Sequence, residues 1–252
     1  MDGLPKPRRY LAVFAISCGT ALNVIDGAIP NVALPTIALD MDVAPSAAVM
    51  IVSVYQLVLV MTLLPFSALG ARIGLRPLYQ YGQALFIVSA VLCFFAPNLP
   101  MLLAARTLQA LGAAAALSVA SALVRSIYPS GQLGRGLGIN SVVVASSAAL
   151  APILGGFIVS VMSWPWVFVA TLPLALLSLA VGQHSLPDPK PRRERYDLLG
   201  ALLCALTFGL IISGLLALAQ GYPPPESLAV VLFGILIACV FVRRELTESA
   251  PI

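Results

Sequence analysis

Long apolar runs separated by short polar or proline-containing connections make up most of this chain. A run of about 20 apolar residues can cross the hydrocarbon core of a bilayer as one helix. Eight runs approach or exceed this length: residues 10–34, 47–69, 78–96, 101–123, 136–162, 166–182, 198–219 and 227–242. Asp40 with Asp42, and the three prolines at 223–225, mark two of the breaks. The pattern predicts eight membrane-spanning helices.

The amino-acid composition supports this interpretation. Hydrophobic residues make up 60% of the chain and charged residues 10%, against about 45–50% and about 25% in soluble domains. Only helices and closed barrels satisfy their backbone hydrogen bonds inside lipid. The sequence therefore predicts an all-α, polytopic membrane protein that resides in the lipid bilayer. Its charge of +4 is scattered between the apolar runs, which excludes the clustered basic face of a nucleic-acid-binding protein.

Lysine and arginine gather in every second connection, and short cytoplasmic loops keep an excess of these residues. Thirteen of the fourteen basic residues lie before the first run or after the second, fourth, sixth and eighth. This distribution predicts a multi-pass protein of the inner (plasma) membrane with both the N-terminus and the C-terminus in the cytoplasm.

The longest polar segment, residues 184–197, carries four of these basic residues between positions 190 and 195. We interpret it as a cytoplasmic basic loop between two domains. Residues 1–183 then form a six-helix domain, and residues 198–252 form two additional transmembrane helices with a truncated C-terminal tail.

Two charged residues lie inside the predicted spans. Asp26 lies in the first span and Arg106 in the fourth. At about 1.5 Å per residue, Asp26 is roughly 24 Å from the start of its span at Tyr10, and Arg106 is roughly 12 Å from Asn98. The two spans run in opposite directions, so both side chains are expected in the outer half of the membrane, within one cavity. Placing a charged side chain at such depth in lipid costs free energy, so these side chains are expected to face protein or water.

Two interpretations of this pair remain open. Asp26 and Arg106 form a static ion pair that orients their helices, or Asp26 is a proton site. A neighbouring arginine and access to water both change the proton affinity of a carboxyl group. A conformational change that moves Arg106 would therefore switch Asp26 between proton binding and proton release.

Two of the spans resemble a known family. Asp26 is followed by Asn-Val-Ala-Leu-Pro at residues 31–35, which is similar to the signature of the fourteen-helix drug/proton antiporter branch of the major facilitator superfamily, the EmrB/QacA-like transporters. Residues 103–112 resemble the Arg-x-x-Gln-Gly-x-Gly motif of the fourth helix, with Ala110 in place of one glycine. The resemblance implies a role in proton transfer for Arg106.

The connection after the second span resembles the superfamily's cytoplasmic loop motif in three residues: Arg72, Gly74 and Arg76. Ala71 stands where the motif has an aspartate. Glycine permits a tight turn, and the two arginines set the topology.

The fifth span resembles the antiporter motif, with Ser147 and Ala151 in place of its first and third glycines. The matching residues that follow are Pro152, Gly155 and Gly156. Small residues allow helices to approach closely and proline bends them. The motif indicates either a packing seam or the hinge of an antiporter.

The resemblance covers essentially the whole chain and implies the N-terminal portion of a secondary transporter that exports lipophilic or cationic small molecules in exchange for protons. Such transporters bind substrate between two six-helix halves, so a C-terminal six-helix half is expected as a partner. Polar residues within spans one, two, four and five are the candidate substrate-facing groups: Asn23, Asn31, Tyr55, Gln56, Gln109 and Asn140. Each is alternatively an interhelical hydrogen-bonding group.

The sequence suggests two alternatives to a transporter. The chain is alternatively a truncated or split half-transporter that is inactive alone, or a membrane interaction subunit. An integral-membrane enzyme would require clustered acids or histidines, and one buried acid with one arginine is a poor supply. The four cysteines lack metal-site spacing, so neither a metal nor a cofactor is predicted.

Overall fold

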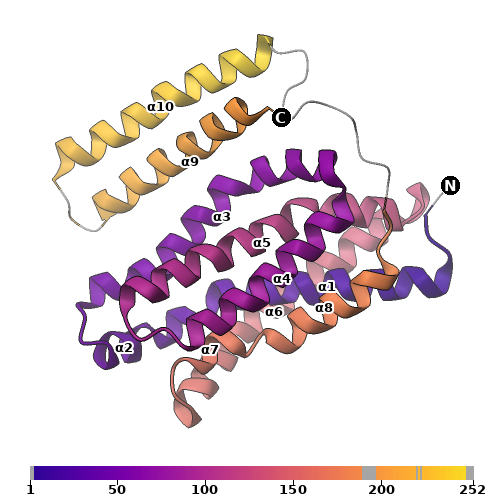
Figure 1. Cartoon of the computed structure of the whole chain (residues 1–252), viewed down its shortest axis with the longest axis horizontal. Helices are drawn as coiled ribbons and strands as arrows, with labels where there is room; N and C mark the ends of the chain where they lie inside the picture. The colour runs from indigo at the N-terminus through magenta and orange to yellow at the C-terminus, as the bar shows by residue number, and fades with distance from the viewer. Residues whose placement is uncertain (1–2, 189–196, 220, 222, 248–252) are drawn as a thin grey trace.

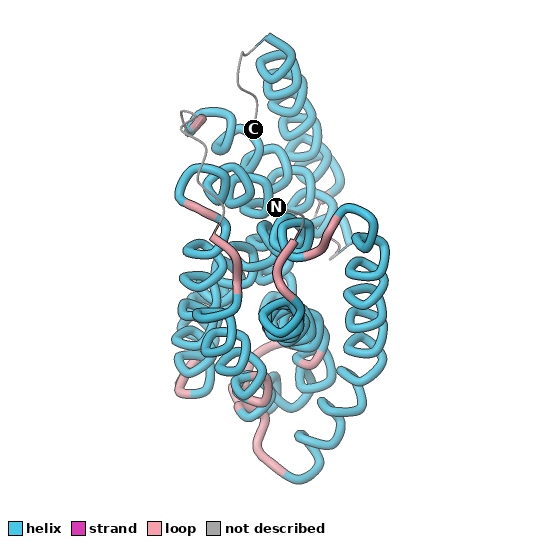
Figure 2. Tube along the Cα trace, turned by 90° about the vertical axis from the view of Figure 1, so that its right-hand side faces the viewer, coloured by secondary structure: helices cyan, strands magenta, loops and turns pink. Residues whose placement is uncertain are grey.

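The computed structural model describes residues 3–188, 197–219, 221 and 223–247. These residues form helices and loops, with no strand among them (Figure 2). The predicted basic residues at 190–195 lie outside the described residues. Eight of the helical segments are long and apolar enough to cross a membrane, which confirms the predicted all-α architecture with eight spans.

The helices follow the predicted order, and most extend a few residues beyond the apolar runs. Their bounds are α1 (Lys6–Ala28), α2 (Pro30–Asp40), α3 (Pro45–Ile73), α4 (Leu75–Phe94), α5 (Leu99–Ile127), α6 (Leu133–Val161), α7 (Trp166–Val169), α8 (Leu172–Ser185), α9 (Leu198–Ala219) and α10 (Pro224–Thr247). A short 3-10 helix, η1 (Ser130–Gln132), precedes α6.

The helix is interrupted within the first and sixth runs, although each run still contributes one membrane span. The first run divides into α1 and α2 at Ile29, because Pro30 has no amide hydrogen and its ring displaces the preceding turn. The sixth divides into α7 and α8, and Pro173 lies in the first turn of α8. The division at Ile29 comes three residues after Asp26.

The first six spans form a bundle, and the α9–α10 pair lies outside it next to α3 (Figure 1). Glycines set the closest approaches between helices. A methyl group on Gly82 of α4 would lie 2.7 Å from the Gly112 carbonyl oxygen of α5, and one on Gly209 of α9 would lie 2.7 Å from the side chain of Met61. Larger residues at these positions would force the helices apart.

Arginines close the end of the bundle that contains the N-terminus, which we term the basic end. Arg8 donates to the carbonyl oxygens of Ser185 (3.1 Å) and Leu186 (3.2 Å), and Arg76 donates to the carbonyl oxygen of Gln183. The last carbonyls of a helix carry partial negative charge and favour cations. Arg8 and Arg76 therefore cap α8 from two other helices.

Gly74 connects α3 to α4 in a single residue with a φ of 108°, a conformation that glycine adopts without strain. This turn places Arg76 over the end of α8, whereas Arg72 is exposed. Among the motif residues predicted in this connection, Arg76 thus has a packing contact in addition to any effect on topology.

A polar contact links two segments at the opposite end of the bundle. The indole nitrogen of Trp164 donates to the carboxylate of Asp40 over 2.7 Å. This bond connects the end of α2 to the segment between α6 and α7. Trp164 is buried, in contrast to the half-exposed Trp166.

Asp197 and Arg244 join the start of α9 to the end of α10. Arg244 donates to both carboxylate oxygens, and Asp197 also accepts from the amide of Gly200 at 3.0 Å. The hydrogen bonds from Arg244 hold the pKa of the Asp197 carboxyl below its usual value. A lowered folded-state pKa means that the stabilisation is complete above the unfolded pKa of about 3.9 and is lost as pH falls through the folded value.

We therefore expect the start of α9, at Asp197, and the end of α10, at Arg244, to remain together at neutral pH. They should separate in acid below about pH 4. Pulsed electron paramagnetic resonance between spin labels on the two ends measures this separation. Asp197→Asn serves as the control and should give the longer distance at neutral pH. Equal distances in both proteins across the titration would contradict the prediction.

Candidate functional site

Asp26 and Arg106 form an ion pair in the interior of the bundle. Nη1 of Arg106 lies 2.9 Å from Oδ2 of Asp26, and both side chains have no exposed surface. Asp26 comes from the last turns of α1 and Arg106 from the first half of α5. The antiparallel course of these two helices places the charges at the same depth, away from the basic end.

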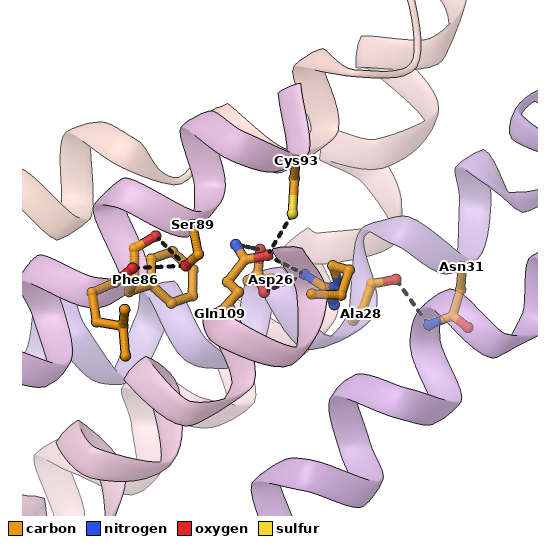
Figure 3. A network of polar contacts seen from close by, with 9 residues as sticks. Asp26, Ala28, Asn31, Phe86, Ser89, Cys93 and Gln109 are labelled. Carbon is orange, nitrogen blue, oxygen red and sulfur yellow. Dashed lines mark hydrogen bonds and ion pairs between the residues drawn. The ribbon is translucent and has the colours of Figure 1, made fainter. Parts of the chain in front are cut away.

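Gln109 completes a closed polar network with the pair. Its Nε2 donates to Oδ1 of Asp26 at 3.0 Å, and its Oε1 accepts from Nη1 of Arg106 at 2.8 Å. The thiol of Cys93 in α4 donates to the same Oε1 at 3.4 Å. Figure 3 shows Asp26, Gln109 and Cys93 grouped between the helices, whereas Asn31 makes a separate contact with Ala28.

Aromatic rings cover the guanidinium of Arg106. Its Cζ lies 4.1 Å from the ring centroid of Tyr55 in α3 and 5.4 Å from that of Phe168 in α7. Such cation–π contacts are worth about 2 kcal/mol when the cation is desolvated. Nε and Nη2 have no hydrogen-bond partner among the described residues. The guanidinium is thus held by one carboxylate, one amide and two rings.

This arrangement links the ionisation of one residue to the position of another. The pair carries no net charge, and a buried ion pair that loses one partner leaves an uncompensated charge. Protonation of Asp26 would leave the Arg106 cation unbalanced inside the bundle. Arg106 would then have to move toward water or another acceptor, and its free N–H groups could bind that acceptor.

The structure divides the predicted substrate-facing residues into three pairs. Tyr55 and Gln109 belong to the Asp26 network described above. Gln56 is exposed, and its Nε2 lies 3.5 Å from where a methyl group on Gly27 would be. Asn31 is also exposed and donates to the Ala28 carbonyl oxygen at 3.1 Å. Gln56 and Asn31 thus lie on the surface near Asp26.

The other two residues of this set lie elsewhere. Asn23 is buried, and its amide donates to the Gly19 carbonyl oxygen of its own helix at 2.7 Å. Asn140 in α6 accepts a hydrogen bond from the Thr20 hydroxyl at 3.1 Å, which links α6 to α1. Neither residue contacts the carboxylate of Asp26.

The small residues of the α6 motif pack against the break between α1 and α2. Ala151 and Gly155 are buried, and a methyl group on Gly155 would lie 3.2 Å from the Ile29 carbonyl oxygen. Pro152 is exposed, and a methyl group on Gly156 would meet open space. Ala151 and Gly155 therefore face the interior, as Ser147 of the same motif does, and Gly155 supports the chain immediately after Asp26.

Sequence reasoning missed Cys93 and Phe168 as members of the network. Neither residue differs from ordinary apolar packing residues in its span, so no signal in a single sequence identifies them. In the described part of the chain, no group of three or more histidine, cysteine, aspartate or glutamate residues is placed to hold a metal ion.

Comparison with known proteins decides the family. The family model for the Major Facilitator Superfamily matches residues 16–201, which is more than half of the chain. The chain belongs to the Major Facilitator Superfamily. Members of this superfamily are transporters and not enzymes, so the enzyme alternative is excluded.

Several curated superfamily members are similar along the chain. An uncharacterized transporter, YebQ, of Escherichia coli (strain K12) is 42% identical over 100% of this chain and 55% of its own length. The riboflavin transporter RibZ of Clostridioides difficile (strain 630) is 30% identical over 81% of this chain and 45% of its own length. The multidrug efflux pump LfrA of Mycolicibacterium smegmatis is 29% identical over 100% of this chain and 51% of its own length.

Solved superfamily structures share the fold. A crystal structure of the peptide transporter POT in complex with sulfate superposes with a TM-score of 0.69 at 17% identity, covering 96% of this chain and 53% of the other. The chain therefore spans about half the length of the curated relatives and solved transporters that it matches.

Proposed function

We propose that this superfamily member acts in proton-coupled export of lipophilic or cationic small molecules, as in the fourteen-helix drug/proton antiporter branch. The observation that carries the proposal is the fully buried ion pair of Asp26 and Arg106, joined by Gln109 and covered by two aromatic rings. Three N–H groups of this buried arginine have no hydrogen-bond partner in the described part of the chain, which a purely structural pair would not require.

In the proposed cycle, Asp26 alternates between an ionised form paired with Arg106 and a protonated form. Protonation removes the counter-charge of Arg106 and favours a second arrangement of the helices. The break at Ile29 and the seam at Gly155 adjoin the ion pair, so α2 can change its angle to α1 there. One arrangement admits substrate from the cytoplasm, and the other releases it outside while a proton enters.

The distribution of basic residues supports the orientation in this cycle. Arg8, Arg9 and Arg76 lie at the basic end, and cytoplasmic segments retain such residues. We therefore propose that the basic end faces the cytoplasm of the inner membrane. In this orientation Asp26 and Arg106 lie in the outer half of the bilayer.

The exposed amides support a substrate site that is shared with a second half of the transporter. Asn31 and Gln56 are exposed within spans, and lipid cannot satisfy such groups. Only four residues of the 29-residue α3 are buried. We propose that a C-terminal six-helix half covers this surface, with Asn31 and Gln56 in the cavity between the halves.

Two relatives support the transport of organic molecules, and one of them supports efflux. LfrA is a multidrug efflux pump and RibZ is a riboflavin transporter. A half-transporter that is inactive alone, or that serves as a membrane interaction subunit, is the second candidate. It is favoured by the chain's coverage of about half of each relative.

Transport in everted membrane vesicles tests the proposal. Vesicles with an acidic lumen should accumulate ethidium when they contain this chain together with a C-terminal six-helix half, and nigericin should abolish the accumulation. Vesicles with this chain alone should accumulate none. Accumulation of riboflavin without ethidium would overturn the substrate class. Gradient-independent accumulation would overturn proton coupling, and transport by the chain alone would overturn the need for a second half.

A further inference from the structure

A cluster of buried polar side chains, distinct from the Asp26 network, lies between α1, α4 and α8. It is closer to the basic end than Asp26. We term it the α4 polar cluster and define it by five residues: Gly19, Asn23, Tyr79, Gln83 and Ser178. The Tyr79 hydroxyl lies 2.8 Å from that of Ser178 and donates to the Ala15 carbonyl oxygen at 3.2 Å. A methyl group on Gly19 would lie 2.1 Å from the Tyr79 hydroxyl and 2.7 Å from Nε2 of Gln83.

Although the Tyr79 hydroxyl and the Gln83 side chain interact, three polar atoms of the α4 polar cluster make no hydrogen bond of normal geometry with any of the described residues. They are Oδ1 of Asn23 and both Nε2 and Oε1 of Gln83. The side chains are buried, with Gln83 1% exposed and Asn23 7% exposed. Lipid offers these atoms no partner. Buried water commonly satisfies such groups and makes about three hydrogen bonds.

Polar contacts continue from the α4 polar cluster to the basic end along the interface of α4 and α8. One helical turn from Gln83 toward the basic end, the Tyr79 hydroxyl contacts the Ser178 hydroxyl. The side-chain amide of Gln80 lies 3.2 Å from the Leu179 carbonyl oxygen. One further turn below, Arg76 binds the Gln183 carbonyl oxygen. Residues three or four apart share one face of a helix, so α4 presents a continuous polar face to α8.

Polar residues on α1 connect the α4 polar cluster toward Asp26. Gly19, Asn23 and Asp26 are separated by four and three residues, which places them on one face of the helix. The Asn23 amide is fixed on the Gly19 carbonyl oxygen, so its free Oδ1 is available to a further donor. Leu22 and Phe86 pack nearby as apolar neighbours.

We infer that the α4 polar cluster binds water and conducts the proton between Asp26 and the basic end, by a route separate from the face that carries Asn31 and Gln56. This inference rests on the proposed function. A proton that leaves Asp26 is accepted by a neighbouring water, which releases another proton to the next. Each water returns to neutrality, the carboxylate remains with Arg106, and one proton emerges at the basic end.

The inference implies separate paths for the two transported species. Substrate would use the exposed surface of α3 and α2, whereas the proton would pass between α1, α4 and α8. A bulky substrate in the central cavity would then not block proton release. The hydroxyl and amide groups of the α4 polar cluster are neutral. They would therefore orient the water molecules without binding the hydrated proton tightly.

Internal water is tested by X-ray radiolytic labelling of the purified chain in nanodiscs. Tyr79 is 1% exposed, so hydroxyl radicals modify it only if water lies beside it. We expect Tyr79 to be modified in the wild-type protein. Modification should fall about tenfold in Gln83→Leu, which corresponds to a loss of about 1.4 kcal/mol in the binding free energy of the water. An unmodified Tyr79 in the wild-type protein would overturn the inference.

Conduction is tested by the rate at which Asp26 equilibrates with solvent after a pH jump, followed by infrared absorption of its carboxyl group. The signal is assigned by its loss in Asp26→Asn. Gln83→Leu should slow the equilibration of Asp26 about tenfold. This corresponds to an increase of about 1.4 kcal/mol in the activation free energy of proton exchange. Tyr79→Phe, which removes one hydroxyl, should slow it as well and replaces Gln83→Leu if that protein does not fold.

Ser89→Ala is the matched control, because Ser89 is a buried α4 residue whose hydroxyl bonds to carbonyl oxygens of its own helix. Its equilibration rate should equal that of the wild-type protein. A wild-type rate in Gln83→Leu would overturn the conduit, since a purely structural role for Gln83 predicts no kinetic change. The measurement needs no substrate, so it is independent of whether transport is proton-coupled.

Discussion

Asp26→Asn is expected to reduce gradient-driven transport by the complete protein to the level of empty vesicles. Asparagine has nearly the same shape as aspartate but cannot bind and release a proton in the physiological range. Insertion should be unaffected, because the surrounding hydrogen-bonding groups remain. Ethidium accumulation in everted vesicles with an acidic lumen measures the loss, and the amount of protein in the membrane is determined in parallel.

The matched control is Asp40→Asn, which removes the carboxylate that accepts from Trp164 at the opposite end of the bundle. This variant should retain coupling, because Asp40 has no contact with Arg106. A second assay, exchange of substrate across the membrane without a gradient, should survive in Asp26→Asn. Full gradient-driven transport by Asp26→Asn would refute the assignment of Asp26 as the proton site.

Arg106→Leu is expected to cause the largest loss of stability. Removal of the guanidinium leaves the Asp26 carboxylate buried without a counter-charge, and deletion of one member of a buried ion pair costs about 3–5 kcal/mol. The change also deletes the contacts with the rings of Tyr55 and Phe168. Unfolding of the detergent-solubilised protein, followed by circular dichroism against denaturant, measures the difference.

The double variant Asp26→Asn with Arg106→Leu separates the charge effect from packing. It should recover much of the stability lost in Arg106→Leu, because no unpaired charge remains. Arg106→Lys keeps a charge but cannot reproduce the planar contacts with two rings and an amide, so it should fall between wild type and Arg106→Leu. Additive effects of the two single changes would contradict a coupled pair.

The sequence predicts the spans well because hydrophobic length and charge placement are local properties. All eight spans were predicted. The rise per residue also predicted that Asp26 and Arg106 would lie at a similar depth along the bundle. Local pattern does not reveal that Pro30 divides the first span, because proline inside an apolar run is compatible with either a bend or a break. Domain limits and residue roles remain predictions.

Side-chain partners were less predictable than spans. Gln109 and Tyr55 were predicted to face substrate, which remains a prediction. Their contacts with the Asp26–Arg106 pair were not predicted, because the rotation of α3 and α5 decides where each side chain points. Gln83 and Tyr79 were overlooked although both are polar, lie within the third span and are four residues apart. Polar spacing of this kind on a helix is a signal that would have found the α4 polar cluster.

The contacts of Arg8 with the end of α8 have a consequence for biosynthesis. They join residues that are 177 and 178 positions apart, so these hydrogen bonds cannot form until the sixth span has been synthesised. Arg8 acquires its carbonyl partners on α8 only after that point. Closure of the basic end is therefore a late event in assembly, and a nascent chain halted before Ser185 would leave α1 without this anchor.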